Sequence, residues 1–370
     1  MIQALIKRYK QMRTERFLRQ TYQYQYAFVG MGQHSLTNLY PVLHYLGVPL
    51  KYICVTSARK ARLIDQKFPN VKATTSLNEI LNDDAIKGIF VSAYPTAHFS
   101  IASQVLRSGK SLFIEKPPCQ SLEELDTLIA LQQQYGIPEN SSPTRSLSRV
   151  AMVGMQKRYA PAIQLLKRRI RKEHLVSYDL NYLTGAYPGG DALLDLYIHP
   201  LDLVCHLFGL PRILACRQVA KDSYILMLQH PHIVGTLELS TAYTWTAAKE
   251  TLKICTKSGI YTLSQMEELT FTPTSSTVLG IPMEKLRPRH EKKEFLFQRN
   301  NYTPILANNQ VYTQGYYSEI EAFISQVEKK ESKVTTCLKA VRGTYELLQT
   351  VQSAKTSLSE HKNSIFTKIH

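Results

Sequence analysis

The sequence predicts an α/β domain built on a parallel sheet, followed by an α+β domain with a large, mostly antiparallel open sheet. The length of 370 residues suits two domains better than one core. Residues 26–155 alternate short apolar runs with helical segments, which is typical of a parallel sheet with helices on both faces. The second half instead holds successive strand-like runs with few helices. We expect a basic helical extension over 1–22, a dinucleotide-binding domain over 23–150 and a substrate domain over 151–370.

The composition excludes several classes of protein. The chain is 44% hydrophobic and 20% charged, with 16 glycines and 17 prolines, so it is neither disordered nor collagenous. Its six cysteines form no C-x-x-C pair, which argues against a zinc ribbon and fits a cytoplasmic protein with reduced thiols. No segment has the roughly 18 uninterrupted apolar residues of a membrane span.

The net charge of +16 favours anionic ligands without choosing among them. The basic run 167–172 has no nucleic-acid-binding motif beside it, so we expect a solvated helix face and no nucleic-acid partner. The basic segment 1–20 predicts an amphipathic helix. Packing on its own domain is the expected role of this helix, and docking on a membrane or a partner is the alternative.

Five apolar runs in the first half are expected to be strands: 26–29, 52–55, 88–91, 111–114 and 150–153. Helical segments lie between them at 58–68, 77–81, 98–107 and 122–135, whereas 136–148 has the composition of a loop. In the second half, Pro161 opens a helix, and 191–208 predicts another. The expected strands there are 176–183, 213–220, 224–228, 233–239, 251–256 and 260–263, followed by helices at about 316–328 and 334–354.

The first strand ends in a glycine-rich turn that leads into a helix. Gly30 allows a tight turn, and Gly32 allows the backbone to approach a pyrophosphate at the helix N-terminus, next to Gln33 and His34. Ser35 stands where the third glycine of the G-x-G-x-x-G pattern would be, a position that a small residue can fill. The turn therefore predicts dinucleotide binding, with a plain strand-to-helix turn as the alternative.

The end of the second strand indicates which dinucleotide is bound. NAD-binding folds usually place an acidic residue there to hold the ribose 2′-hydroxyl. This chain has no Asp or Glu between Glu15 and Asp65, and instead carries Ser57, Arg59 and Lys60. Cations and hydroxyls suit a 2′-phosphate, so NADP(H) is favoured over NAD(H). The alternative is that the two cations simply begin a solvated helix.

Three further motifs carry a family resemblance. Glu115-Lys116-Pro117 directly follows a predicted strand, and Gly189-Gly-Asp-Ala-Leu-Leu-Asp195-Leu-Tyr-Ile-His199 opens a helix. Gly154-Met-Gln-Lys-Arg-Tyr-Ala-Pro161 lies between them. Together, over residues 24–354, they resemble the glucose–fructose oxidoreductase/inositol dehydrogenase/rhizopine-catabolism (Gfo/Idh/MocA) family. The departures are Ser35, a longer 136–148 stretch and the extra N-terminal segment.

The resemblance implies a nicotinamide-dependent oxidation or reduction at a carbon of a sugar, inositol or related polyol. Lys116 matches the catalytic lysine of the family and would stabilise an alkoxide or share a proton transfer. His199 is the expected proton carrier. Asp195, four residues earlier, would orient the imidazole if one continuous helix places both on one face. Pro117 would fix the bend that aims the lysine.

Other residues at the carboxyl ends of the strands are expected to contact the ligands. The cofactor candidates there are Pro95, His98, Glu115, Pro117 and Gln156. The candidates for binding a small polar substrate are Tyr182, Tyr187 and Asp202. In related enzymes the open sheet forms a dimer interface, so a homo-oligomer through strands 213–263 is expected here.

Three alternatives stay open. Asp195, His199, Asp202 and His206 are spaced four, three and four, which would also suit a metal ion, although no metal is expected and His206 is interpreted as structural. A non-catalytic regulator or scaffold that uses the same fold to sense a dinucleotide is a second interpretation. Reduction of a non-sugar such as a tetrapyrrole or an imine is a third interpretation.

Overall fold

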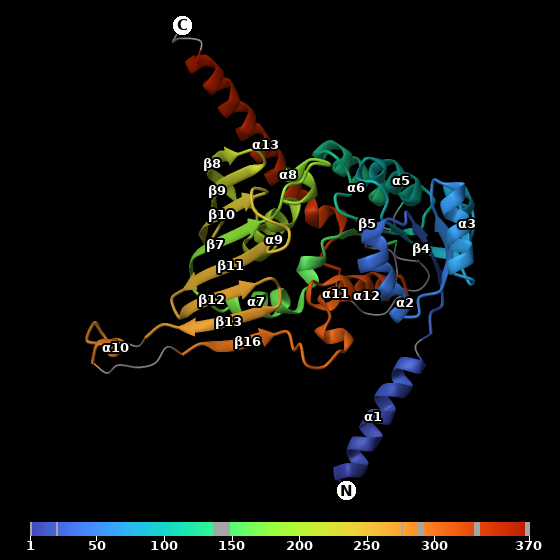
Figure 1. Ribbon diagram of the computed structural model, residues 1–370, viewed down its shortest axis with the longest axis horizontal. Helices are drawn as coiled ribbons and strands as arrows, with labels where there is room; N and C mark the ends of the chain where they lie inside the picture. The colour runs from blue at the N-terminus through green and yellow to red at the C-terminus, as the bar shows by residue number, and fades with distance from the viewer. Residues whose placement is uncertain are drawn as a thin grey trace.

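A computed structural model describes residues 2–19, 21–135, 149–275, 277–286, 292–328 and 334–366. The chain forms two domains that lie side by side, with a helix projecting from the body at each end of the chain (Figure 1). The expected fold class is confirmed: a parallel sheet in the first domain and a mostly antiparallel sheet in the second. No described helix is both long and apolar enough to cross a membrane.

The first domain is built on a six-stranded parallel sheet with the order β3-β2-β1-β4-β5-β6. The strands are β1 (Gln25–Val29), β2 (Leu50–Cys54), β3 (Lys72–Thr74), β4 (Ile86–Val91), β5 (Ser111–Glu115) and β6 (Ala151–Gly154). The short β3 was not expected from the sequence. The chain runs outward from β1 in both directions, so the gap between the β1 and β4 ends is a topological switch point where ligands bind in such sheets.

Helices connect the strands of this sheet. After β1 come a π-helical turn η1 (Ser35–Leu39) and α2 (Tyr40–Tyr45), followed by α3 (Ala58–Lys67), α4 (Leu77–Leu81), α5 (Pro95–Arg107) and α6 (Leu122–Tyr135). These helices lie where the sequence predicted helices, although α5 begins earlier, at Pro95, whose fixed φ suits a first helical turn. The expected loop at 136–148 lies outside the described residues.

The second domain holds an eight-stranded sheet with the order β16-β13-β12-β11-β7-β10-β9-β8. Its strands are β7 (Leu175–Leu183), β8 (Arg212–Ala220), β9 (Ser223–Gln229), β10 (Val234–Ser240), β11 (Lys249–Thr256), β12 (Gly259–Ser264), β13 (Glu268–Pro273) and β16 (Glu294–Gln298). Within this sheet, β7 and β10 are the only described strands that pair in parallel, and the other described neighbours are antiparallel. A small hairpin of β14 (Thr277–Val278) and β15 (Ile281–Pro282), followed by α10 (Met283–Leu286), extends from the sheet. The strands after β12 were missed from the sequence.

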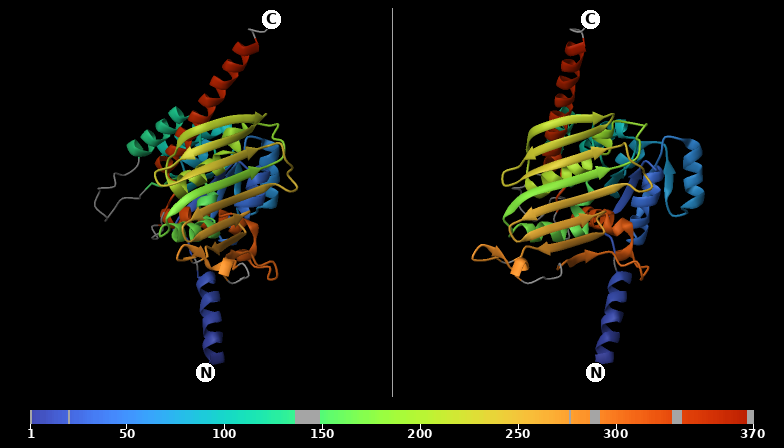
Figure 2. Two further views of the ribbon diagram at one scale, coloured as in Figure 1. Left: turned by 90° about the vertical axis from the view of Figure 1, so that its left-hand side faces the viewer. Right: turned by 60° about the vertical axis from the view of Figure 1, so that its left-hand side comes forward.

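Helices cover one face of this sheet and leave the other uncovered by any described helix (Figure 2). The covering helices are α7 (Pro161–Ile170), α9 (Ile198–Phe208) and α13 (Leu338–Phe366). Short elements complete the domain: η2 (Gln156–Tyr159), α8 (Ala192–Asp195), η3 (Leu306–Asn308) and α11 (Gln310–Thr313).

The expectation of one continuous helix over 191–208 was wrong. The segment forms two helices, α8 and α9, separated by a turn at Leu196 and Tyr197. Pro200 accounts for the break, because it has no N–H to donate to the Leu196 carbonyl and its ring crowds that position. A new helix starts instead, and Pro200 is tolerated in its first turn.

The last part of the chain returns to the first domain. In α12 (Tyr316–Val327), the Phe323 ring lies 5.0 Å from Phe90 and 5.7 Å from Phe113, both on the parallel sheet. The carboxylate of Glu328 accepts hydrogen bonds from the Tyr26 hydroxyl at 2.9 Å and from the Gln23 amide at 2.8 Å. Residues about 300 positions apart thus share one core, which holds the two domains against each other around the site.

Candidate active site

A cleft of about 800 Å³ opens at the carboxyl ends of β1, β2, β4 and β5. Ten of the candidate residues line it: Gly30, Gly32, Gln33, His34, Lys60, Pro95, His98, Glu115, Lys116 and Tyr187. Tyr187 and Leu196 come from the second domain, so the cleft lies between the domains. Other candidates are not among its lining residues: Ser57, Arg59, Pro117, Gln156, Tyr182, Asp195, His199 and Asp202.

The glycine turn brings the chain close to the neighbouring strand. Gly30 has φ +87°, and a Cβ there would lie 2.4 Å from the Ser92 carbonyl oxygen after β4. A Cβ on Gly32 would meet only open space. Ser35 is buried and donates its hydroxyl to Ser92 Oγ at 2.9 Å, so a serine fills the packing position of the third glycine. The backbone is therefore bare where a pyrophosphate would approach it.

The end of β2 is basic. Ser57 caps α3 by accepting a hydrogen bond from the Lys60 amide at 3.4 Å. Arg59 and Lys60 are both exposed in the first turn of α3, and of the two only Lys60 is among the residues that line the cleft. Among the residues that line the cleft, Glu115 is the only carboxylate, and it follows β5 rather than β2. No lining carboxylate thus opposes an anion at the β2 end.

Lys116 joins the two domains across the cleft. Its Nζ donates to the backbone carbonyl of Asp195 at 2.6 Å, and the Asp195 carboxylate accepts from the Tyr187 hydroxyl at 3.2 Å. Gly190 makes room for this cluster, because a Cβ there would lie 2.2 Å from Asp195 Oδ2. Burial lowers the pKa of Lys116 and raises that of Asp195, and burial with the nearby Asp195 charge raises the pKa of Tyr187 to about 12.

His199 lies just behind this cluster in a cationic environment. Its side chain is buried, and burial followed by the charges of Lys116, Lys157 and His34 lowers its pKa well below the usual value. The imidazole is therefore neutral at pH 7. The break between α8 and α9 separates His199 from the α8 turn of Asp195, whose carboxylate is bonded to Tyr187. The structure thus replaces the expected continuous helix face with a Tyr187–Asp195–Lys116 cluster.

His98 ties together the turns that follow β4 and β5. Its ring is buried, with Nδ1 2.7 Å from the Pro117 carbonyl and Nε2 3.1 Å from the Ala93 carbonyl. The peptide bond between Lys116 and Pro117 is cis. Pro117 therefore acts here through its carbonyl, which His98 holds in place beside the lysine.

Two buried polar atoms at the cleft have no hydrogen-bond partner among the described residues. They are His34 Nε2 and Glu115 Oε1, which lie 3.5 Å apart. Both side chains line the cleft, and such buried unsatisfied atoms are rare in proteins. Their position suits polar groups of a bound ligand.

Sequence reasoning missed two side chains next to the predicted ones. Tyr316 from α12 accepts a hydrogen bond from Gln156 Nε2 at 3.3 Å, and its ring lies 5.7 Å from that of His34. The buried Lys157 forms an ion pair with Glu250, and its Nζ lies 4.8 Å above the Tyr182 ring. Lys157 lies inside a motif already recognised, so that signal was available, whereas nothing in the sequence places α12 here.

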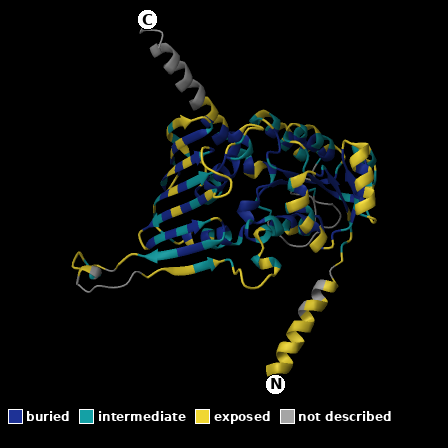
Figure 3. Ribbon diagram, in the orientation of Figure 1, coloured by how far each residue is buried: buried dark blue, intermediate teal, exposed yellow. Residues whose placement is uncertain are grey.

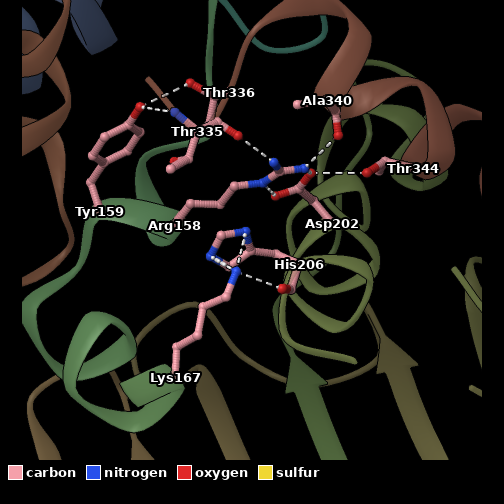
Figure 4. Close-up of polar contacts among 9 residues, drawn as sticks. All are labelled: Arg158, Tyr159, Lys167, Asp202, His206, Thr335, Thr336, Ala340 and Thr344. Carbon is pink, nitrogen blue, oxygen red and sulfur yellow. Dashed lines mark hydrogen bonds and ion pairs between the residues drawn. The ribbon is translucent and has the colours of Figure 1, made fainter. Parts of the chain in front are cut away.

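Asp202, expected at the substrate, lies instead in a buried polar network (Figure 4). Its two carboxylate oxygens accept from Arg158 Nη2 at 2.6 Å and Nε at 2.8 Å, and one also accepts from the Thr344 hydroxyl at 2.9 Å. Arg158 donates further to the Thr335 and Ala340 carbonyls. These bonds use the polar atoms of both side chains inside the protein.

His206 lies beside the same network. The Lys167 Nζ is 3.0 Å from its Nε2 and donates to its backbone carbonyl at 2.9 Å (Figure 4). Burial, followed by the positive charges of Arg158, Lys167 and Arg171, lowers the pKa of His206 to about 3. The four side chains spaced along 195–206 therefore do not share one site: Asp195 bonds to Tyr187, Asp202 to Arg158, and His206 lies beside Lys167. Among the described residues, no group of three or more His, Cys, Asp or Glu side chains is placed to hold a metal ion.

Comparisons with known proteins agree with this architecture. Residues 24–137 match the family model GFO_IDH_MocA, described as an oxidoreductase family with an NAD-binding Rossmann fold. Residues 185–361 match the model of the family's C-terminal alpha/beta domain. The solved levoglucosan dehydrogenase, in complex with NADH and levoglucosan, superposes with a TM-score of 0.73 at 15% identity, covering 90% of this chain and 97% of that one.

Two curated relatives are similar in sequence. YceM of Salmonella typhimurium, which is named as an oxidoreductase, is 24% identical over 249 residues, or 65% of this chain and 76% of YceM. The scyllo-inositol 2-dehydrogenase (NADP(+)) IolW of Bacillus subtilis is 24% identical over 186 residues. That match covers 46% of this chain and about half (48%) of IolW. The two family models match in the order of the two domains, and the fold carries the glycine turn and Lys116. The chain therefore belongs to the Gfo/Idh/MocA family of NAD-binding oxidoreductases.

Proposed function

We propose that the protein transfers a hydride between a nicotinamide cofactor and a hydroxyl or keto carbon of a sugar, inositol or related polyol. The observation that supports this most is the bond from Lys116 Nζ to the Asp195 carbonyl across the mouth of the cleft. It places the lysine where the dinucleotide domain meets the substrate domain. When bound, the cofactor supplies the hydride chemistry, and the protein's task is to hold the substrate and move a proton.

The cleft residues suit a dinucleotide. The bare backbone at Gly30 and Gly32 and the free N–H groups at the start of η1 would hold the pyrophosphate, with Gln33 and His34 beside it. His34 Nε2 and Glu115 Oε1, which make only a long 3.5 Å contact with each other and no hydrogen bond, would bond to polar groups of the ligand. Pro95 and His98 would form part of the cleft lining. Pro117 would hold His98 in place through its carbonyl, and Gln156 would hold Tyr316.

The proton would pass through His199. A neutral imidazole accepts the hydroxyl proton when an alcohol is oxidised and returns it when a ketone is reduced. The Lys116 ammonium would stabilise the alkoxide that forms on the substrate oxygen. Asp195 would keep Lys116 in place through its carbonyl and Tyr187 through its carboxylate, a positioning role.

The substrate would lie against tyrosines of the second domain. Tyr187 reaches the cleft, and Tyr182 lies behind it under Lys157. Aromatic faces with nearby hydroxyl and ammonium groups suit a small polyhydroxylated ring. The names of IolW and of levoglucosan dehydrogenase, which cite scyllo-inositol and levoglucosan, support the same substrate class.

We further propose that two copies pair through the uncovered face of the large sheet. Ile225 and Met227 point outward there and are partly exposed, next to Thr236 and Glu238 on β10.

All six cysteines have free thiols, which supports the cytoplasm as the compartment.

A turnover screen tests the proposed function. Full-length protein is incubated with NADP⁺ or NAD⁺ and a panel of sugars, inositols and polyols, and reduced cofactor is followed by absorbance. We expect at least one of these substrates to be oxidised, with no turnover by the Gly30→Val variant. No oxidation of any member of the panel with either cofactor would contradict the proposal.

The β2 end gives a prediction of cofactor preference. Lys60→Ala should weaken NADPH binding by roughly tenfold, because a charge-assisted hydrogen bond to the 2′-phosphate is lost, and should leave NADH binding almost unchanged. Arg59→Ala should act in the same direction, with a smaller effect because Arg59 is not among the lining residues. Fluorescence titration with both cofactors measures this difference. Equal losses for both, or a wild type that prefers NADH, would remove the argument.

A further inference from the structure

The helix α1 (Ile2–Leu18) extends away from the body instead of packing on its own domain as expected, and all of its side chains that the structure describes are exposed (Figures 1 and 3). Six of its large apolar side chains are open to solvent: Ile2 74%, Leu5 62%, Ile6 48%, Tyr9 61%, Met12 54% and Leu18 75%. The spacing 2, 5, 6, 9 and 12 places the first five on one face over the first three turns of the helix, whereas positions 13 and 16 on the same face are arginines and Leu18 lies on the opposite face. An exposed apolar stripe of this kind usually marks a binding surface.

The rest of α1 is strongly basic. The helix holds five cations, Lys7, Arg8, Lys10, Arg13 and Arg16, with Arg19 just after its end, and it holds one carboxylate, Glu15. The Glu15 carboxylate is 3.0 Å from Arg19, so a cation already neutralises it. At 3.6 residues per turn, Arg8 and Lys10 flank the apolar stripe on its two sides, and Lys7 lies opposite it. The partner surface must therefore accept apolar side chains and carry negative charge.

Two other partners fit less well. A coiled coil with a second copy needs an apolar seam over at least three or four heptads, whereas this stripe covers residues 2–12. The next seam position after Ile2 and Tyr9 is Arg16, and pairing two such helices would bring like charges together. The helix also fails the length and apolarity needed to cross a bilayer.

We propose that α1 docks the protein reversibly on an anionic membrane surface. The apolar stripe lies at the boundary of headgroups and acyl chains, and the flanking cations contact the lipid phosphates. The chain just after the helix is fixed to the body, because the Tyr22 hydroxyl donates to the Leu46 carbonyl at 2.6 Å and the Gln23 amide donates to Glu328. A docked α1 would thus hold the dinucleotide-binding domain at the membrane.

Vesicle cosedimentation of the full chain tests this inference. The probes are vesicles of phosphatidylcholine alone and vesicles of phosphatidylcholine with an equal part of anionic phosphatidylglycerol. We expect binding only to the anionic vesicles, weakened by high salt. Replacing Lys7, Arg8 and Lys10 by glutamine should weaken vesicle binding on the order of 100-fold. Each of the three cations near an anionic surface should strengthen binding by roughly fivefold, and these factors multiply. Leu5→Gln with Ile6→Gln should weaken it as well.

A matched control removes the same charge elsewhere. Arg168, Lys172 and Lys221 are exposed on the body, and glutamine at all three should leave vesicle binding nearly unchanged. Thermal unfolding of each variant checks that the body is intact. Absence of binding to anionic vesicles would overturn the inference, as would equal losses in the control and the α1 variants. If the wild type binds no vesicles but forms oligomers that the α1 variants do not form, the inference is wrong and the apolar stripe binds a second protein chain.

Discussion

Lys116→Ala should lower kcat by about 10²–10³-fold, because it removes the cation proposed to stabilise the substrate alkoxide. His199→Ala should lower it by about 10²–10⁴-fold through loss of the proton carrier. Both variants should still bind the dinucleotide, whose pyrophosphate would rest on the glycine turn. The measurement is steady-state turnover with a substrate from the screen, beside a cofactor titration of each variant.

The chain offers a matched control for each variant. Lys110 is also a buried lysine next to β5, but it lies at the amino end of the strand and donates to the Asp83 and Ile86 carbonyls. Lys110→Ala should lower stability and leave kcat nearly unchanged. His206→Ala should likewise spare turnover, because His206 lies in the Lys167 network. If Lys116→Ala lost no more turnover than Lys110→Ala, the proposed role of Lys116 would be wrong.

Asp202→Ala should lower the free energy of unfolding by about 3–5 kcal/mol. The variant leaves the Arg158 guanidinium buried without its carboxylate, and it also removes the acceptor of Thr344. The Asp202 charge and hydrogen bonds raise the pKa of Arg158, which keeps its charge despite burial. Urea unfolding measures the loss. Asp202→Asn, which keeps the shape and removes the charge, should lose a large part of the same free energy.

An exposed pair of the same chemistry is the control. Arg342 on α13 forms two hydrogen bonds to the carboxylate of Asp126 on α6, at 2.7 and 3.1 Å, with both side chains about half exposed. Asp126→Ala should lower the free energy of unfolding far less than Asp202→Ala does, because water screens the exposed pair. Similar losses for Asp126→Ala and Asp202→Ala would contradict the claim that burial makes the Arg158 pair essential.

Local chemistry explains what the sequence could predict. The glycine turn at Gly30 and the lysine after β5 are short patterns whose backbone context is set by neighbouring residues, and the structure places both at the cleft. Strand–helix alternation predicted the parallel sheet, because each element is defined by a nearby hydrophobic period.

Long-range pairing explains what the sequence could not predict. The return of α12 to the first domain depends on Phe323 packing on Phe90, which local periodicity does not encode. Asp202 was expected to bind the substrate because the sequence does not show that Arg158, 44 positions earlier, donates hydrogen bonds to both of its carboxylate oxygens. The continuous 191–208 helix was expected from apolar spacing, although Pro200 was visible and argued for a break.

A cofactor titration tests the central claim most directly, and the chain contains its own reporter. Trp245 is the only tryptophan, and its Nε1 donates to the Ala186 carbonyl, next to Tyr187 at the cleft. With NADPH added, we predict saturable energy transfer from Trp245 to the reduced nicotinamide. Gly30→Val should abolish it, because the side chain would collide with the Ser92 backbone. Absence of saturable binding of both NADPH and NADH to the wild type below millimolar concentration would contradict the account.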